Sequence, residues 1–228
     1  MDIFTSKKLV KDTLENDFDK NRFYYFIKNV LNKFDDAKAF HSHGYVKEKF
    51  KKTVEIVKTY ERLGTYTDSE GSKIDILIVY LEKQNSLDRG RTSLRNFVAD
   101  YLQQRDSKDA ALVAFVSPDK QDWRFSFIKM EYRIDTDGKK IKTKTELTPA
   151  RRFSFLVGKN ENSHTAQRQL LPVLQDDKNN PLLSDLEKAF NIEVVTQEFF
   201  EKYKSLFLDV KDSLERLMKK DPNIANDF

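Results

Sequence analysis

Apolar residues recur at helical spacing near both ends of the chain. Residues 197–219 carry them in alternating steps of three and four, which predicts a long amphipathic helix. Shorter patterns predict helices over residues 87–104, 165–171 and 182–190. Near the N-terminus the rhythm i, i+3, i+4, i+7, i+8, i+11 predicts a further helix, formed by Phe23, Phe26, Ile27, Val30, Leu31 and Phe34.

Between these helices the chain carries patterns typical of β-strands. The strongest covers residues 73–83, and its continuous apolar centre indicates a strand buried on both faces. It follows a β-prone segment, residues 53–66, and the turn-forming run Asp68-Ser69-Glu70-Gly71. Further strands are predicted at residues 110–116, 123–134, 140–147 and 152–157, with the middle two forming a hairpin.

The order of these elements predicts an α/β (α+β) fold, a mixed sheet flanked by helices, with a C-terminal helical extension. The polar stretch 175–180 is the best candidate joint. We therefore expect an α/β domain over residues 1–175 and a helical extension or connector over residues 176–228. The C-terminus carries no clear ending signal after its long helix, so we expect the chain to be a piece of a larger protein.

The amino-acid composition limits the kinds of function that the protein could have. The 228 residues include 41 basic and 37 acidic side chains, a net charge of +4, so nucleic-acid binding would depend on local clustering. The absence of cysteine excludes disulfides, thiolate zinc sites and cysteine nucleophiles. No apolar run approaches the ~20 residues that span a bilayer. We expect a soluble cytoplasmic protein without a membrane partner.

One acidic residue, Asp75, interrupts the front of the apolar strand 73–83. A buried carboxylate is costly unless it is paired, hydrogen-bonded or bound to a metal. If the turn centres near residues 69–70, Asp75 lies opposite Gly64 or Thr65. A glycine inside a strand often marks the close approach of a backbone or a ligand.

Two further carboxylates, Glu61 and Asp68, lie on the partner strand of Asp75. Together these three could hold Mg²⁺, with Asp75 as the metal ligand, and the metal would activate water against a phosphodiester. They are the candidate catalytic residues. The alternative is that Asp75 only caps the strand or pairs with Lys73 or Arg62.

The carboxylate–lysine triplet of PD-(D/E)XK nucleases is not clearly present. Glu82 and Lys83 are adjacent and point to opposite faces, and Lys83 lies about 26 Å from Asp75 along a straight strand. Pro118-Asp119 followed by Glu131-Tyr132-Arg133 imitates the motif, but the first pair equally fits a turn. Any site of this class would be degenerate.

Two basic clusters are candidate DNA contacts. The first follows strand 73–83, where arginine favours phosphate because its guanidinium presents paired donors; it contains Arg89, Arg91 and Arg95. The second alternates along one predicted strand, where it would track a backbone or protect a sheet edge from aggregation; it contains Lys140, Lys142 and Lys144. Solvated surface charge is the alternative for the arginines.

Three blocks of sequence stand out together: GTYTDSEGSKIDILIVYLEK with RGRTSLRNFVADYL, then DAALVAFVSPDKQDWRFSFIKMEY, then RRFSFLVGKNENSHTAQRQL leading into NIEVVTQEFFEKYKSLF. These blocks resemble the N-terminal region of type IIG-like restriction–modification enzymes of bacteria. Such proteins join an adenine-specific, SAM-dependent DNA methyltransferase to nuclease and target-recognition parts. The resemblance spans roughly residues 50–220.

The resemblance implies a restriction-endonuclease-like domain that acts on double-stranded DNA, with Mg²⁺ as its cofactor. SAM would bind only in the methyltransferase part, which this chain lacks, since Asn180-Pro181-Leu182 does not match that part's Asn-Pro-Pro-aromatic motif. The partners would be DNA and the rest of the same polypeptide. The alternative is a non-catalytic module that binds DNA or docks the other domains through helix 197–219.

Overall fold

The structure is a computed structural model that describes residues 1–228 except 38, 42–55, 85–86, 88–89, 104–107, 138–139, 148–153, 177, 179 and 221–228. Its elements, in chain order, are α1 (Ile3–Leu14), α2 (Lys20–Val30), β1 (Phe40–His41), β2 (Val57–Thr67), β3 (Lys73–Leu81), α4 (Arg91–Gln103), β4 (Ala110–Val116), β5 (Asp122–Asp137), β6 (Lys140–Leu147), β7 (Ser154–Gly158), α5 (His164–Gln175), α6 (Leu183–Phe190) and α7 (Ile192–Lys220).

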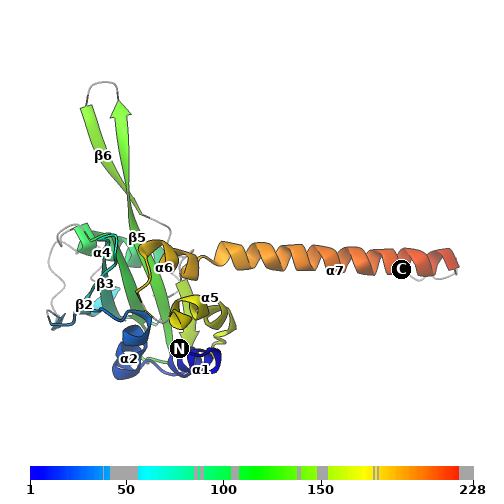
Figure 1. Ribbon diagram of the computed structural model, residues 1–228, viewed down its shortest axis with the longest axis horizontal. Helices are drawn as coiled ribbons and strands as arrows, with labels where there is room; N and C mark the ends of the chain where they lie inside the picture. The colour runs from blue at the N-terminus through cyan, green and yellow to red at the C-terminus, as the bar shows by residue number, and fades with distance from the viewer. Residues whose placement is uncertain are drawn as a thin grey trace. The chain divides into compact units, whose positions relative to one another are not determined.

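The strands form a mixed sheet in the order β1-β2-β3-β4-β5 (Figure 1). Strand β3 runs antiparallel to β2 and parallel to β4, and β5 is antiparallel to β4, β6 and β7. Parallel neighbours need a crossover connection, which α4 provides between β3 and β4. The α/β class and the mixed sheet flanked by helices are confirmed.

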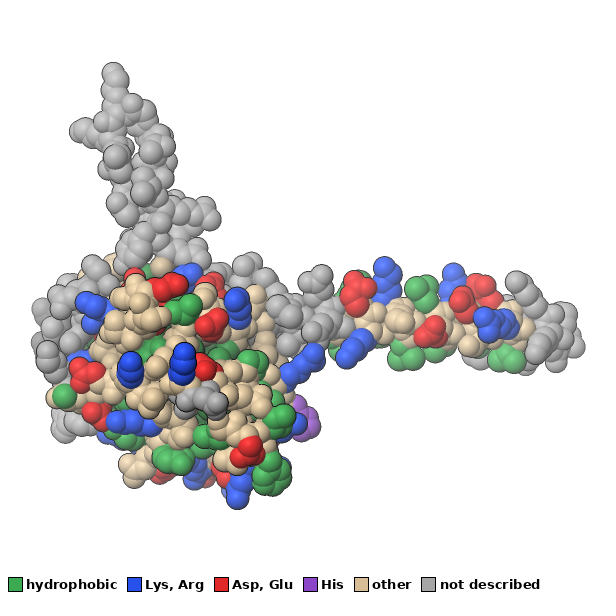
Figure 2. Space-filling model, in the orientation of Figure 1, with side chains coloured by type: hydrophobic (Ala, Val, Ile, Leu, Met, Phe, Trp, Pro, Cys, Tyr) green, Lys and Arg blue, Asp and Glu red, His purple; other side chains and the backbone are tan. Residues whose placement is uncertain are grey.

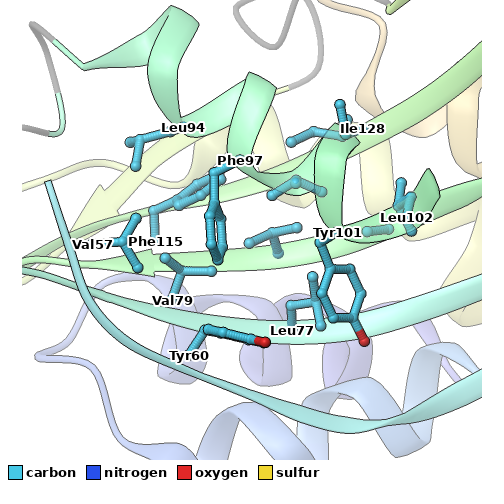
Figure 3. Close-up of a cluster of buried hydrophobic side chains, with 14 of the residues drawn as sticks. Val57, Tyr60, Leu77, Val79, Leu94, Phe97, Tyr101, Leu102, Phe115 and Ile128 are labelled. Carbon is cyan, nitrogen blue, oxygen red and sulfur yellow. The ribbon is translucent and has the colours of Figure 1, made fainter. Parts of the chain in front are cut away.

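Helix α4 covers one face of the sheet. Its residues Phe97 and Tyr101 pack on the odd-numbered residues of β3, such as Leu77 and Val79, and on Tyr60 of β2 (Figure 3). Alternate residues of a strand point to opposite faces, so the even-numbered residues of β3 face the other layer. Of these, Ile74, Ile76 and Ile78 are buried, which confirms the prediction that the centre of β3 is buried on both sides.

The opposite face is packed with aromatic rings. Phe125 of β5 lies at the centre, with ring centroids 5.6 Å from Phe23, 5.8 Å from Phe26 and 5.0 Å from Phe190. These partners come from α2 and α6. Edge-on ring packing of this kind adds to the free energy of apolar burial.

The chain divides into two compact units, Met1–Phe190 and Asn191–Phe228. The first unit extends past residue 175, the boundary expected from the sequence, because α6 belongs to its core. Phe190 packs among the rings of the sheet, and Glu187 pairs with Lys129 of β5 at 2.8 Å.

Helix α1 was not predicted, since its only buried apolar residues are Val10 and Leu14. In the described residues, no helix is long and apolar enough to cross a membrane.

Tyr66 links β2 to the segment before α6, and we expect it to make the stability of the fold depend on pH in the alkaline range. Its buried hydroxyl donates to the carbonyl oxygen of Pro181 at 2.8 Å. Burial, and then the charges of Asp68, Asp176 and Asp185, raise the pKa of Tyr66 to about 12 from 10.0. The unfolded chain therefore loses this proton first, so stability is fully present below pH 10 and falls between pH 10 and about 12.

A shift of this size corresponds to about 2–3 kcal/mol of unfolding free energy. We expect urea unfolding to show this loss as pH rises, and Tyr66→Phe to remove that part of the slope. Tyr25→Phe, at a position 61% exposed, is the matched control and should leave the slope unchanged. An equal alkaline slope in the wild-type chain and Tyr66→Phe would contradict the assignment.

Candidate functional site

Asp75 lies in the core with both carboxylate oxygens hydrogen-bonded. Its residue exposure is 0%, Oδ1 accepts from Thr65 Oγ1 at 2.6 Å, and Oδ2 accepts from the Tyr101 hydroxyl at 2.9 Å. The register places Thr65 opposite Asp75, as predicted. The neighbour on β4 is Ala111, which offers no polar group. Asp75 therefore joins β2, β3 and α4.

The hydrogen bonds continue to Arg62. Its guanidinium Nη1 donates to Thr65 Oγ1 at 2.9 Å, and Thr65 donates in turn to Asp75. Among the described residues, Asp75 is hydrogen-bonded to Thr65 and Tyr101 and is linked to Arg62 through Thr65, which differs from the strand cap and the direct ion pair with Lys73 or Arg62 considered above. A carboxylate bonded on both oxygens satisfies the requirement for burying charge and stabilises the packing of α4 on the sheet.

Glu61 lies on the other face of the sheet from Asp75. It accepts from Lys20 Nζ of α2 at 2.6 Å and from the Tyr80 hydroxyl at 3.0 Å. Burial, followed by the charge and hydrogen bond of Glu61, holds the pKa of Tyr80 well above its usual value. Glu61 therefore anchors α2 to the sheet.

A register shift explains why Glu61 and Asp75 are apart. Strand β2 is irregular between Arg62 and Gly64, so Arg62 pairs with Leu77 and Glu61 with Ile78. Simple alternation from Thr65 would put Glu61 on the face of Asp75. The extra residue at the irregularity reverses the alternation and puts Arg62 there instead.

Asp68 has a structural role in the turn between β2 and β3. Its Oδ1 accepts from the backbone N–H groups of Glu70 at 3.0 Å and Ser72 at 2.8 Å. Its Oδ2 accepts from the backbone N–H of Leu183 at 2.9 Å, at the start of α6. An aspartate commonly satisfies backbone donors in this way at turns and helix starts.

The structure therefore does not bring the three predicted carboxylates together. Asp75 faces α4, Glu61 faces α2, and Asp68 bonds to backbone groups of the turn and α6. Within the described residues, no group of three or more His, Cys, Asp or Glu side chains could hold a metal ion. These carboxylates do not fit an oxygen-ligand site for Mg²⁺, which needs several convergent oxygens.

The second nuclease-like spacing is also separated in space. Pro118-Asp119 forms the turn before β5, where Asp119 accepts from Ser117 Oγ at 2.6 Å and from the Gln121 backbone N–H at 3.1 Å. The Ser117 hydrogen bond is the main cause that lowers the pKa of Asp119. Glu131 lies nine residues along β5 from Asp122, roughly 30 Å at ~3.3 Å per residue.

The three arginines predicted to contact DNA lie in different surroundings. Arg89 lies outside the described residues, while Arg91 begins α4 and Arg95 follows one turn later. Arg91 lines a cavity of only about 10 Å³ with Leu87, Leu94, Phe115, Arg124, Ser126 and Ser154. This cavity has room for about one water and for no larger ligand. Arg95 is half-buried, and its Nη2 lies 3.4 Å from Asn96 Oδ1.

The predicted lysine strand is β6, which pairs with the far half of β5 in a two-stranded ribbon. The register puts Lys140 opposite Asp137, Lys142 opposite Asp135 and Lys144 opposite Arg133. With the Glu131–Glu146 pair, the register therefore brings together four basic and four acidic residues in sequence.

Sequence reasoning missed a surface pocket at the carboxyl ends of the parallel strands. It has a volume of about 230 Å³ and is lined by Lys58, Thr59, Tyr80, Leu81, Glu82, Ser117, Pro118 and Lys120. Ligands in α/β sheets commonly bind outside the carboxyl ends of the strands. The available signal was the strand–helix–strand order of β3, α4 and β4, which places residues 82 and 117 at one edge.

Comparison with protein-family models, curated proteins and solved structures finds no match for this chain.

Proposed function

We propose that the chain is a non-catalytic module of a bacterial restriction–modification protein, in which a restriction-endonuclease-like core serves as a scaffold and α7 is an assembly surface. The observation that carries the proposal is the apolar face of α7. Its residues expose between 44% and 69% of their surface; they are Phe199, Phe200, Tyr203, Leu206, Phe207, Val210, Leu214 and Leu217. The sequence resemblance supplies the restriction–modification context.

The spacing of these residues fits a protein contact. If Leu206 is counted as position d of a heptad, all eight apolar residues fall at positions a, d and e, and Ser213 takes the last d position. This three-residue width is typical of helices that pack in bundles, whereas a strict a/d seam is typical of two-stranded coiled coils. The second unit is one helix in its described part, so it contains nothing that could bury this face.

The bonding of Asp75 favours the scaffold over the endonuclease. Thr65 and Tyr101 occupy both of its oxygens, and Ala111 beside it provides neither a second carboxylate nor a lysine. Phosphodiester hydrolysis by this nuclease class requires convergent carboxylates around a metal. Asp75 instead supports the packing of α4.

Double-stranded DNA and the other domains of such a protein are the partners that this function implies. Lys and Arg side chains are interspersed with Asp and Glu on the face drawn in Figure 2. On a surface of mixed charge, contact with phosphates through groups such as Arg91 and Arg95 would be weak and sensitive to salt, because the neighbouring carboxylates repel phosphate. Lys142 is paired in register with the acidic residue Asp135, so neutralising Lys142 should change DNA affinity little.

The test is incubation of the purified chain with supercoiled plasmid in Mg²⁺ or Mn²⁺, with EDTA and Asp75→Asn as controls. We expect intact plasmid in every lane, because no described carboxylates converge on a metal. A gel shift that disappears as salt rises would fit the DNA-contacting module. Nicking that requires both the metal and Asp75 would overturn the proposal and establish the endonuclease.

A further inference from the structure

We propose that the apolar face of α7 pairs with the same face of a second copy of this chain, in antiparallel orientation. This inference rests on the proposed function, because it names what the assembly surface of α7 binds. Figure 2 shows hydrophobic side chains at intervals along the surface of this helix. The face consists of the eight residues from Phe199 to Leu217 named above.

The area of the face fits a dimer. Its eight side chains are mostly aromatic or leucine and expose about half of their surface, roughly 100 Å² each. One copy therefore contributes about 800 Å², and two copies bury about 1,600 Å² in total. That is the usual size of a specific, stable protein–protein interface. An exposed apolar patch of this size is also larger than most monomers carry.

The distribution of charged residues along α7 favours the antiparallel orientation of the two copies. By its sequence, residues 192–206 carry three acidic and two basic residues, a net charge of −1, whereas residues 207–220 carry three acidic and four basic residues, a net charge of +1. Parallel copies would place like charges side by side at both ends, whereas antiparallel copies place opposite charges together. This arrangement is also two-fold symmetric, which is the commonest symmetry of soluble dimers.

The helix provides its own matched control. Leu206 lies on the apolar face and is 62% exposed, whereas Leu208 is 45% exposed and lies two residues on. Two residues turn a helix by about 200°, so Leu208 is on the opposite side. Leu206→Glu and Leu208→Glu thus make the same change in the same helix on opposite faces.

The first measurement is sedimentation velocity over about a hundredfold range of protein concentration. We expect a species of about twice 26.9 kDa. Leu206→Glu should weaken the dimer by roughly a hundredfold or more, because symmetry places two carboxylates, one from each copy, in an apolar interface. Leu208→Glu should change it little. A dimer that survives Leu206→Glu would use another surface and would overturn the inference.

The absence of cysteine allows a second measurement that separates the two proposals. Leu206→Cys and Leu208→Cys are compared for their rate of thiol alkylation. A monomer with equal rates would overturn the dimer but leave α7 an uncovered assembly surface, so the proposed function would stand. A monomer in which only Leu206→Cys is protected would show α7 packed on its own core and would overturn both. A disulfide dimer of Phe199→Cys would overturn the antiparallel orientation.

Discussion

Gly64→Ala is expected to lower the free energy of unfolding by about 3 kcal/mol, the upper range for overpacking a core. A Cβ at this position would lie 2.3 Å from the carbonyl oxygen of Asp35 and 2.5 Å from Cε2 of Phe34. Neither neighbour can easily move. Asp35 is fixed by reciprocal backbone hydrogen bonds with Thr65, both 2.9 Å, and Phe34 is buried.

Gly71→Ala is the comparison that separates steric conflict from backbone strain. Gly71 has φ of +88° in the turn before β3, but a Cβ at this position would meet nothing within 4 Å. Its substitution should cost about 1 kcal/mol, from the left-handed conformation alone. Urea unfolding of both variants measures the difference. Equal costs would show that the chain opens around Gly64 without penalty and would contradict the close packing.

Gly64 also shows which structural features the sequence alone could predict and which it could not. A glycine inside a strand predicts a close approach, and the structure confirms one, from the chain's own backbone at Asp35. The accompanying register shift in β2 was not predictable, because it depends on the pairing of Arg62 with Leu77. That shift moves Glu61 to the opposite face and separates it from Asp75.

The elements that were predicted well are those with strong local patterns. Strand β4 has the bounds 110–116 expected from its apolar run, and β3 begins at Lys73 as expected. Helix α1 and the position of α6 in the core depend on long-range contacts, such as Tyr66 with Pro181, which periodicity does not reveal. The same long-range contacts extend the first compact unit to Phe190.

The candidate site shows the same division between local and long-range information. The apolar run identified Asp75 as an unusual buried carboxylate, and the turn placed it opposite Thr65. Its second partner, Tyr101, is 26 residues away on α4. Only the crossover of α4 brings this hydroxyl to the carboxylate, so the sequence alone left both metal binding and structural bonding open.

Asp75→Ala is expected to lower the free energy of unfolding by about 3 kcal/mol. The substitution removes the acceptor of two hydroxyl groups in or beside the core, and each such loss costs about 1–3 kcal/mol. Asp75→Asn keeps one acceptor oxygen of the same shape and should cost about half as much. Urea unfolding with and without Mg²⁺ makes the measurement, since a bound ligand stabilises the folded state.

Tyr101→Phe tests whether Asp75 acts through this hydroxyl. If it does, Asp75→Ala and Tyr101→Phe should not be additive, because both remove the same 2.9 Å hydrogen bond. Tyr60→Phe, whose ring packs 5.7 Å from that of Tyr101, controls for loss of a nearby hydroxyl. Additive costs would place the role of Asp75 elsewhere. Stabilisation by Mg²⁺ that disappears in Asp75→Asn would make it a metal ligand, as nuclease chemistry requires and as its two hydroxyl bonds argue against.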